Sequence, residues 1–303
     1  MTVADSAAPL AFRCASGSRD RQDPQLGSAP QARRWLLIEH RGPWQIDALA
    51  GAKIDPEMLA LILSTAATSG ARPLLIRRPG RAGASRDRAW AVSYDSGVTQ
   101  WGTWRTDDDL ATAVAALAAP TPSPGAVADP VILVCAHGLH DACCAIRGRP
   151  VAAALAAQWP DGTWECSHVG GDRFAANVVM LPDGVYYGLL EPDTAVQTVQ
   201  AHLRGEVLLT HLRGMTRVSP PGQVAIAAVH ERFGPLGGRA VNVTSLTHTP
   251  AGVWEVELAV ADAPVGPIRV SVVGTRRAAA QLTCRAGVAT PAMEYHVVSV
   301  VGG

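Results

Sequence analysis

The chain has 303 residues, of which 48% are hydrophobic and 17% charged, so it can bury a core and has room for two domains. Its 26 basic residues balance its 26 acidic residues, and this zero net charge argues against a nucleic-acid binder or a membrane-surface binder. It has no run of 18 apolar residues and its first residues, MTVADSAAPLAF, lack the pattern of a secretory signal, so we expect a cytoplasmic protein without membrane contact.

The first half of the chain predicts alternating strands and helices. No regular element is expected before about residue 34, where Ser, Asp, Gly and Pro are frequent. RWLLIEHRGPW (34–44) is an apolar run ended by Gly-Pro, which is typical of a buried strand. DPEMLALILSTAATSG (55–70) predicts a helix, because Asp55 can cap its start and Gly70 can end it. Three strands and a helix should follow, at RPLLIRR (72–78), RAWAVSYD (88–95), VTQWGTWR (98–105) and DDDLATAVAALAA (107–119).

A Pro- and Gly-rich linker, PTPSPGAVADP (120–130), is the clearest domain boundary in the chain. After it, the same order of elements returns. The second series comprises the strand PVILVC (130–135), the helix RPVAAALAAQW (149–159), the strand TWECSH (163–168), the hairpin VVMLPDGVYYGLL (178–190) and the helix DTAVQTVQAHLRG (193–205). Two halves of matching order predict an α/β protein with two thioredoxin-like domains in tandem, at residues 14–119 and 130–214.

The last part of the chain, residues 215–303, predicts a different architecture. GQVAIAAVHERFG (222–234) predicts a helix. Val-rich segments separated by turn residues follow, and their alternation is typical of antiparallel strands. These segments are AVNVTSL (240–246), VWEVELAV (253–260), IRVSVVGT (268–275), AAQLTCRA (279–286) and YHVVSVVG (295–302). We therefore expect a small antiparallel-sheet extension after the two α/β domains.

Cysteine and histidine residues are concentrated between positions 135 and 172. Cys135 ends a predicted strand, and Cys144 lies nine residues later at a predicted helix start, where helical N–H groups favour a thiolate. Cys166 and His168 alternate on one face of a second strand end, and Asp172 follows His168 with H-x3-D spacing. Since each group comes from the end of a separate strand, we expect these side chains to meet at one site.

The residue types leave three interpretations of this site open. Two thiolates, an imidazole and a fourth group suit Zn²⁺ or a [2Fe–2S] cluster, although the spacing departs from common zinc knuckles and ferredoxin runs. A thiol-disulfide oxidoreductase could use Cys144 with Cys143 or Cys135, but no C-x-x-C is present and adjacent cysteines form strained disulfides. The third interpretation is a set of buried, inert cysteines. Cys14 and Cys284 are isolated in the sequence and are expected to be inert thiols.

VCAHGLHDACC (134–144) and SHVGGDRFAANVVMLPDGVYYG (167–188) resemble the sucrase/ferredoxin-like family. GSAPQARRWLLIEHRGPW (27–44) and LLIRRPG (74–80) are similar to the first domain of the same family, and the resemblance covers about residues 14 to 215. It implies a thioredoxin-like ferredoxin that carries a [2Fe–2S] cluster and transfers electrons between a reductase and an acceptor protein. The arginine-rich stretch 74–88 could help to dock either partner.

The family pattern in fungal members, C-x8-C followed by H-x3-H, assigns Cys135, Cys144 and His168 as cluster ligands here. Asp172 stands where the second histidine would be, so the fourth ligand departs from the pattern. We predict Cys166 in that role because sulfur is softer than a carboxylate oxygen, with Asp172 as the alternative. No pair of carboxylates forms a glycosidase constellation, so we expect an electron carrier rather than a sucrase.

Overall fold

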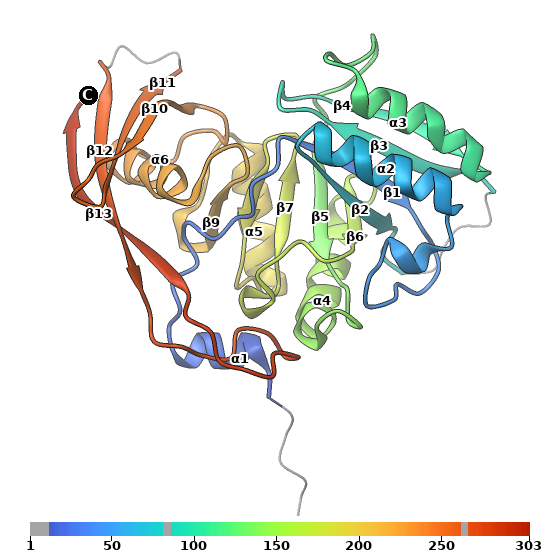
Figure 1. Cartoon of the computed structure of the whole chain (residues 1–303), viewed down its shortest axis with the longest axis horizontal. Helices are drawn as coiled ribbons and strands as arrows, with labels where there is room; N and C mark the ends of the chain where they lie inside the picture. Colours follow the sequence, from blue (N-terminus) through green and yellow to red (C-terminus); the bar gives the residue numbers. More distant parts are fainter. Residues whose placement is uncertain (1–11, 81–85, 262–265) are drawn as a thin grey trace, which may run out of the picture.

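The structure is a computed structural model, and it describes residues 12–80, 86–261 and 266–303 (Figure 1). It is an α/β protein with one mixed sheet of nine strands, flanking helices and a separate antiparallel sheet of four strands. Within the described ranges, none of the helices is long and apolar enough to span a membrane.

The predicted elements of the first half are present. They are the strands β1 (Arg34–Glu39), β2 (Ala71–Arg77), β3 (Arg88–Ser93) and β4 (Thr99–Trp104) and the helices α2 (Pro56–Thr68) and α3 (Leu110–Ala118). β1 runs parallel to β2 and antiparallel to β3, and β3 pairs with β4. Asp55 caps α2 as predicted, since its carboxylate accepts from the N–H groups of Glu57 and Met58.

The second half repeats this strand order. Its elements are β5 (Val131–Cys135), α4 (Ala142–Gln158), β6 (Thr163–Cys166), β7 (Val178–Leu181), β8 (Val185–Tyr187) and α5 (Pro192–Leu203), with β9 (Leu212–Met215) added beside β8. β5 is parallel to β6 and antiparallel to β7, and β7 pairs with β8. In both halves the first strand therefore lies between the second and the third.

The two halves are joined in one sheet rather than forming two separate sheets in tandem. β2 pairs with β6 in antiparallel orientation, with Ile76 opposite Cys166 and Arg77 opposite Glu165. The Arg77 guanidinium lies 2.7 Å from the Glu165 carboxylate across this junction. This pairing could not be predicted from the sequence, because backbone hydrogen bonds at a strand edge do not affect side-chain periodicity.

The C-terminal extension contains a helix and an antiparallel sheet, as predicted. It contains the helix α6 (Pro220–Phe233) and an antiparallel sheet of β10 (Val241–His248), β11 (Val253–Val260), β12 (Ile268–Arg276) and β13 (Met293–Gly302). α6 is buried along most of its length and shares one hydrophobic cluster with the second half of the main sheet. The extension is therefore packed firmly onto the α/β body.

Two segments differ from the predictions at the ends of the chain. A short helix, α1 (Cys14–Asp20), lies in the region expected to be irregular. The strand predicted at 279–286 is absent, and this segment belongs to a long loop between β12 and β13. Figure 1 shows α1 and this loop together at one edge of the molecule. Both segments owe their conformation to tertiary contacts, which local periodicity cannot reveal.

Helix α4 approaches the end of β5 closely at Gly148. A Cβ atom at this position would overlap the carbonyl oxygen of Cys135. We predict that Gly148→Ala lowers the free energy of unfolding by about 1–3 kcal/mol in urea denaturation, despite the better helix propensity of alanine, because the core has no room for the methyl group. Gly266→Ala is the matched control, since no atom lies within 4 Å of a Cβ there. Equal stability of the two variants would contradict the prediction.

Candidate metal centre

Two strand ends and one helix start converge at the candidate site. Cys135 is the last residue of β5 and lies in register with Cys166, the last residue of β6. The chain then turns into α4, where the Asp141 carboxylate accepts from the N–H of Cys143 and caps the helix. Cys144 therefore lies in the first turn of α4, and the close approach at Gly148 brings it towards Cys135.

The structure brings together the three ligands that the resemblance assigned. The Sγ atoms of Cys135 and Cys144 and a ring nitrogen of His168 all lie within 4.8 Å of one another. Both cysteines are buried, whereas the His168 side chain is 24% exposed. Two sulfurs and an imidazole nitrogen at this separation could hold a metal.

Asp172, rather than Cys166, contacts this group directly. The Asp172 Oδ1 atom lies 3.1 Å from Cys144 Sγ and 2.9 Å from His168 Nδ1. Gly170 and Gly171 adopt φ values of +91° and +75°, and the turn that they permit returns the chain to the site. Cys166 is fully buried beside Cys135 but lies outside the group of ligand atoms within 4.8 Å.

The two cysteines differ in protonation. A hydrogen bond from the Cys144 thiol is the main cause that lowers the pKa of Cys135 well below its usual value, against the effect of burial. The same contact and burial raise the pKa of Cys144. These shifts favour the thiolate form of Cys135, which is the form that binds metals.

His168 and Asp172 form an ion pair in the same site. Burial lowers the pKa of His168, but its contacts with Asp172 and Cys135 outweigh burial and raise it to about 9. Burial would raise the pKa of Asp172, but its contacts with His168 and Cys144 lower it. The contact with Asp172 therefore favours the protonated His168 ring beside a carboxylate.

His140 extends the site towards the surface. Its ring stacks on that of His168 with 3.7 Å between centroids, and its Nε2 atom lies 4.0 Å from Asp172 Oδ2. His140, His168 and Asp172 form a second overlapping group with ligand atoms within 4.8 Å. The His137 Nε2 atom contacts the Gln45 carbonyl oxygen at 2.6 Å. All three histidines line an open groove, so the imidazole side of the site reaches solvent while the sulfurs do not.

Arg213, a buried arginine distant in the sequence, stabilises the turn at Gly170 and Gly171. The Arg213 guanidinium donates to the carbonyl oxygen of Gly170 and to Asn177 Oδ1, both at 2.8 Å. Asn177 in turn donates to the carbonyl oxygen of Gly171 at 3.0 Å. Burial lowers the pKa of Arg213 to about 10, so it remains a cation. Sequence analysis missed this residue, because nothing in its local pattern links it to a turn more than 40 positions earlier.

Cys14 and Cys284 are not isolated, contrary to the prediction. Their sulfurs lie beside Cys143 and the Asp141 carboxylate, and the four ligand atoms lie within 4.8 Å of one another. Both residues come from the two segments whose structure the sequence did not predict.

Fold and site together define an α/β protein with buried Cys, His and Asp clusters that could hold a metal. A family model described as sucrase/ferredoxin-like matches residues 25–214, which is more than half of the chain, and the chain belongs to this family. A search of curated proteins and a search of solved structures each found no match. The matched range includes the Cys135 site but neither Cys14 nor Cys284.

The ion pair predicts how the metal-free protein responds to pH. The folded pKa of His168 is about 9, above the ordinary value of about 6.5, so folding favours the protonated ring. This stabilisation should be fully present below about pH 6.5 and should be lost as the pH rises through about 9. Histidine resonances in an NMR titration should show one ring that titrates near pH 9, and Asp172→Asn should lower its midpoint. A His168 midpoint near 6.5 would refute the ion pair.

Proposed function

We propose that this protein is an electron carrier that binds a [2Fe–2S] cluster through Cys135, Cys144, His168 and Asp172. One observation carries the proposal: two buried sulfurs and one imidazole nitrogen converge within 4.8 Å in a chain of the sucrase/ferredoxin-like family. When bound, the cluster would supply a one-electron redox centre, which the side chains of this protein lack.

The donor set suits such a cluster. Thiolates and imidazoles bind iron in mixed-ligand [2Fe–2S] centres, where the nitrogen ligands serve one of the two irons. The Cys144 contact lowers the pKa of Cys135, and Asp172 contacts the His168 ring at 2.9 Å. Imidazole ligation raises the reduction potential relative to four thiolates, so a potential above that of plant-type ferredoxins is expected.

Asp172 is the best-supported fourth ligand. It occupies the position of the second histidine in the family pattern, and its carboxylate already contacts both Cys144 and His168. Cys166 is the softer ligand, and neither Cys166 nor Asp172 belongs to the group of Cys135, Cys144 and His168 within 4.8 Å. We favour Asp172 because its carboxylate contacts two members of that group, whereas Cys166 is fully buried in the sheet. A carboxylate also adds negative charge, and the buried Arg213 cation behind the Gly170 turn helps to balance it.

Electrons would pass through the histidine side of the site. His168 and His140 are 24% and 35% exposed, whereas the cysteines are covered by protein. A reductase and an acceptor protein would therefore dock on the groove lined by the histidines, Arg72 and residues 46–49. This surface is better suited than the arginine-rich stretch 74–88, whose residues 81–85 lie outside the described part. In that stretch Arg77 pairs with Glu165, and Arg78 donates to backbone carbonyls at 160, 161 and 163.

The thioredoxin-like nature of the two halves is part of this proposal. It is supported by the shared strand order, with the first strand between the second and third. Each half also has one helix between its first two strands and one after its fourth strand. The proposed units are residues 14–119 and 130–214, fused through β2 and β6, with 215–303 as the extension. A cytoplasmic location also belongs to the proposal, because all six cysteines are free thiols and a reducing compartment would keep them so.

Two alternatives use the same residues. A structural zinc ion would need the same four ligands and no electron transfer. A thiol-disulfide oxidoreductase is favoured by the unequal pKa values of Cys135 and Cys144, which resemble those of an attacking thiolate and its partner. Both sulfurs are buried, however, and a thiolate must be accessible to attack a substrate disulfide.

Iron and sulfide analysis of anaerobically purified protein tests the cluster. We expect a brown protein with two irons and two acid-labile sulfides per chain. Cys135→Ser and Cys144→Ser should each abolish the visible absorption, because each removes a sulfur ligand to iron. A colourless wild-type protein that holds one zinc at Cys135, or no metal there, would exclude the electron carrier.

The fourth ligand can be tested by two single substitutions. Asp172→Ala should change the visible spectrum strongly and lower the iron content, since it removes a ligand and the partner of His168. Cys166→Ser is the matched comparison and should leave the spectrum within a few nanometres of the wild-type positions. The reverse pattern would assign Cys166 as the ligand and Asp172 as a neighbour of His168.

A further inference from the structure

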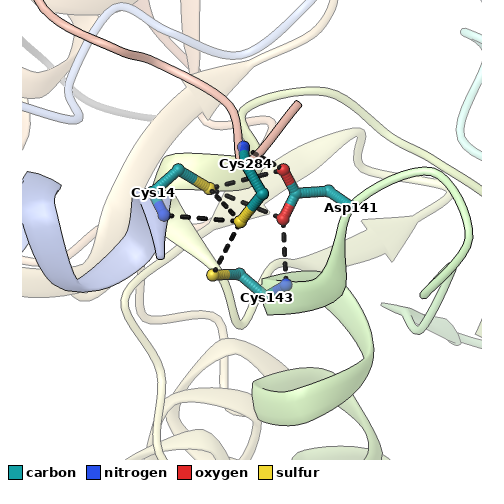
Figure 2. A group of neighbouring side chains, drawn as sticks. All are labelled: Cys14, Asp141, Cys143 and Cys284. Atoms are coloured by element: carbon teal, nitrogen blue, oxygen red, sulfur yellow. Dashed lines mark hydrogen bonds between the residues drawn. The ribbon is translucent and has the colours of Figure 1, made fainter. Parts of the chain in front are cut away.

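A second cluster of metal-ligand residues lies beside the first and contains Cys14, Asp141, Cys143 and Cys284 (Figure 2). Cys14 begins α1, Asp141 and Cys143 are at the start of α4, and Cys284 lies in the loop between β12 and β13. Three segments that are more than 120 residues apart in the sequence thus each contribute at least one sulfur or carboxylate. Figure 2 shows the three sulfurs and the carboxylate pointing towards a common centre.

The separations between these atoms suit a single ion. Cys284 Sγ lies 3.5 Å from Cys143 Sγ and 3.6 Å from Cys14 Sγ. Both carboxylate oxygens of Asp141 lie 3.5 Å from Cys14 Sγ. Four ligands arranged tetrahedrally at about 2.0–2.3 Å from one Zn²⁺ stand about 3.5–3.8 Å apart, so the existing spacing needs little adjustment. A disulfide would need two of the sulfurs at about 2.05 Å, much closer than any pair here.

The surroundings of Asp141 also favour a bound metal ion. This carboxylate is 1% exposed and accepts backbone N–H groups from Cys143 at 2.9 Å and Cys284 at 2.7 Å. Among the residues that the structure describes, no Lys, Arg or His side chain forms an ion pair with it. Three thiols surround this carboxylate, and a divalent metal would offset the negative charge that the four groups carry as ligands.

We propose that Cys14, Cys143, Cys284 and Asp141 bind one Zn²⁺ ion as a structural site. Zinc accepts thiolate and carboxylate ligands together and takes four ligands in closed, tetrahedral sites. A polynuclear iron–sulfur cluster is less suitable, because it would place these sulfurs on different irons and force them further apart. The site is separate from the Cys135 centre, and two of its ligands lie outside the region that the family model matches.

The zinc ion would fix the start of α4 from three directions. Cys143 and Asp141 hold the first turn of the helix, and the next residue, Cys144, belongs to the candidate cluster site. Cys14 and Cys284 would anchor α1 and the β12–β13 loop to that turn. The C-terminal extension would then have a structural role, because its β12–β13 loop supplies Cys284 to a metal site that the α/β body alone cannot complete.

Metal analysis of the full chain, expressed with both iron and zinc in the medium, tests the proposal. We expect about one zinc per chain in the wild-type protein. Cys14→Ser and Cys284→Ser should each lose this zinc and retain the metal of the Cys135 centre. Cys135→Ser should lose the metal of its own centre and keep the zinc. Cys166→Ser, a buried cysteine outside both clusters, is the matched control and should keep the zinc.

A second measurement covers the case in which the serine variants fold poorly. Cys135→Ala protein, which keeps Cys14, Cys143 and Cys284, should after reconstitution with Co²⁺ show the intense visible bands of tetrahedral cobalt and the near-ultraviolet band of cobalt–thiolate bonds. Lack of both bands, a wild-type protein free of zinc, or zinc retained in the Cys14→Ser, Cys284→Ser double variant would overturn the proposal. So would an intact mass two daltons below that of the fully reduced chain, with a disulfide mapped to Cys143 and Cys284 or to Cys14 and Cys284.

The two metal proposals fail independently. A colourless protein whose zinc depends on Cys14 and Cys284 would support this site and exclude the iron–sulfur cluster. A brown protein without zinc would do the reverse.

Discussion

The contact between helix α4 and the end of strand β5 places the cysteines of both candidate metal sites. Gly148 lies against the Cys135 carbonyl group, where a larger residue would not fit, so the first turn of α4 stands beside the last residue of β5. This contact brings the two cysteine sulfurs together. Asp141 caps the same turn. Cys144 packs with the residues of the sheet, and Cys143 packs with Cys14 and Cys284.

The adjacent residues Cys143 and Cys144 thus belong to different clusters. Cys144 lies beside Cys135 and His168, where its contact lowers the pKa of the Cys135 thiol. The Cys144 thiol also lies 3.1 Å from the Asp172 carboxylate. Cys143 joins Cys14 and Cys284, which belong to the N-terminal helix and the extension. One helical turn therefore connects the candidate redox centre to the parts of the chain outside the family match.

Sequence reasoning succeeded where local patterns are strong. The apolar run VILVC predicted β5, Asp55 predicted the cap of α2, and the strand-end positions predicted that Cys135, Cys144 and His168 would converge. It was less successful where tertiary contacts decide. The β2–β6 junction depends on backbone pairing, and α1 and the β12–β13 loop are held by residues distant in the sequence. The positive φ values of Gly170 and Gly171 precede Asp172 and shape the turn that carries it, which residue types alone do not specify.

In the proposed [2Fe–2S] site, Cys135 and Cys144 would hold one iron, and His168 and Asp172 would hold the other. Mössbauer spectroscopy of protein enriched in ⁵⁷Fe tests this directly, because the isomer shift of each iron reports its ligands. We expect two quadrupole doublets of equal area in the oxidised protein, with the larger isomer shift belonging to the iron bound by nitrogen and oxygen. A single doublet from two equivalent irons, or protein without bound iron, would contradict it.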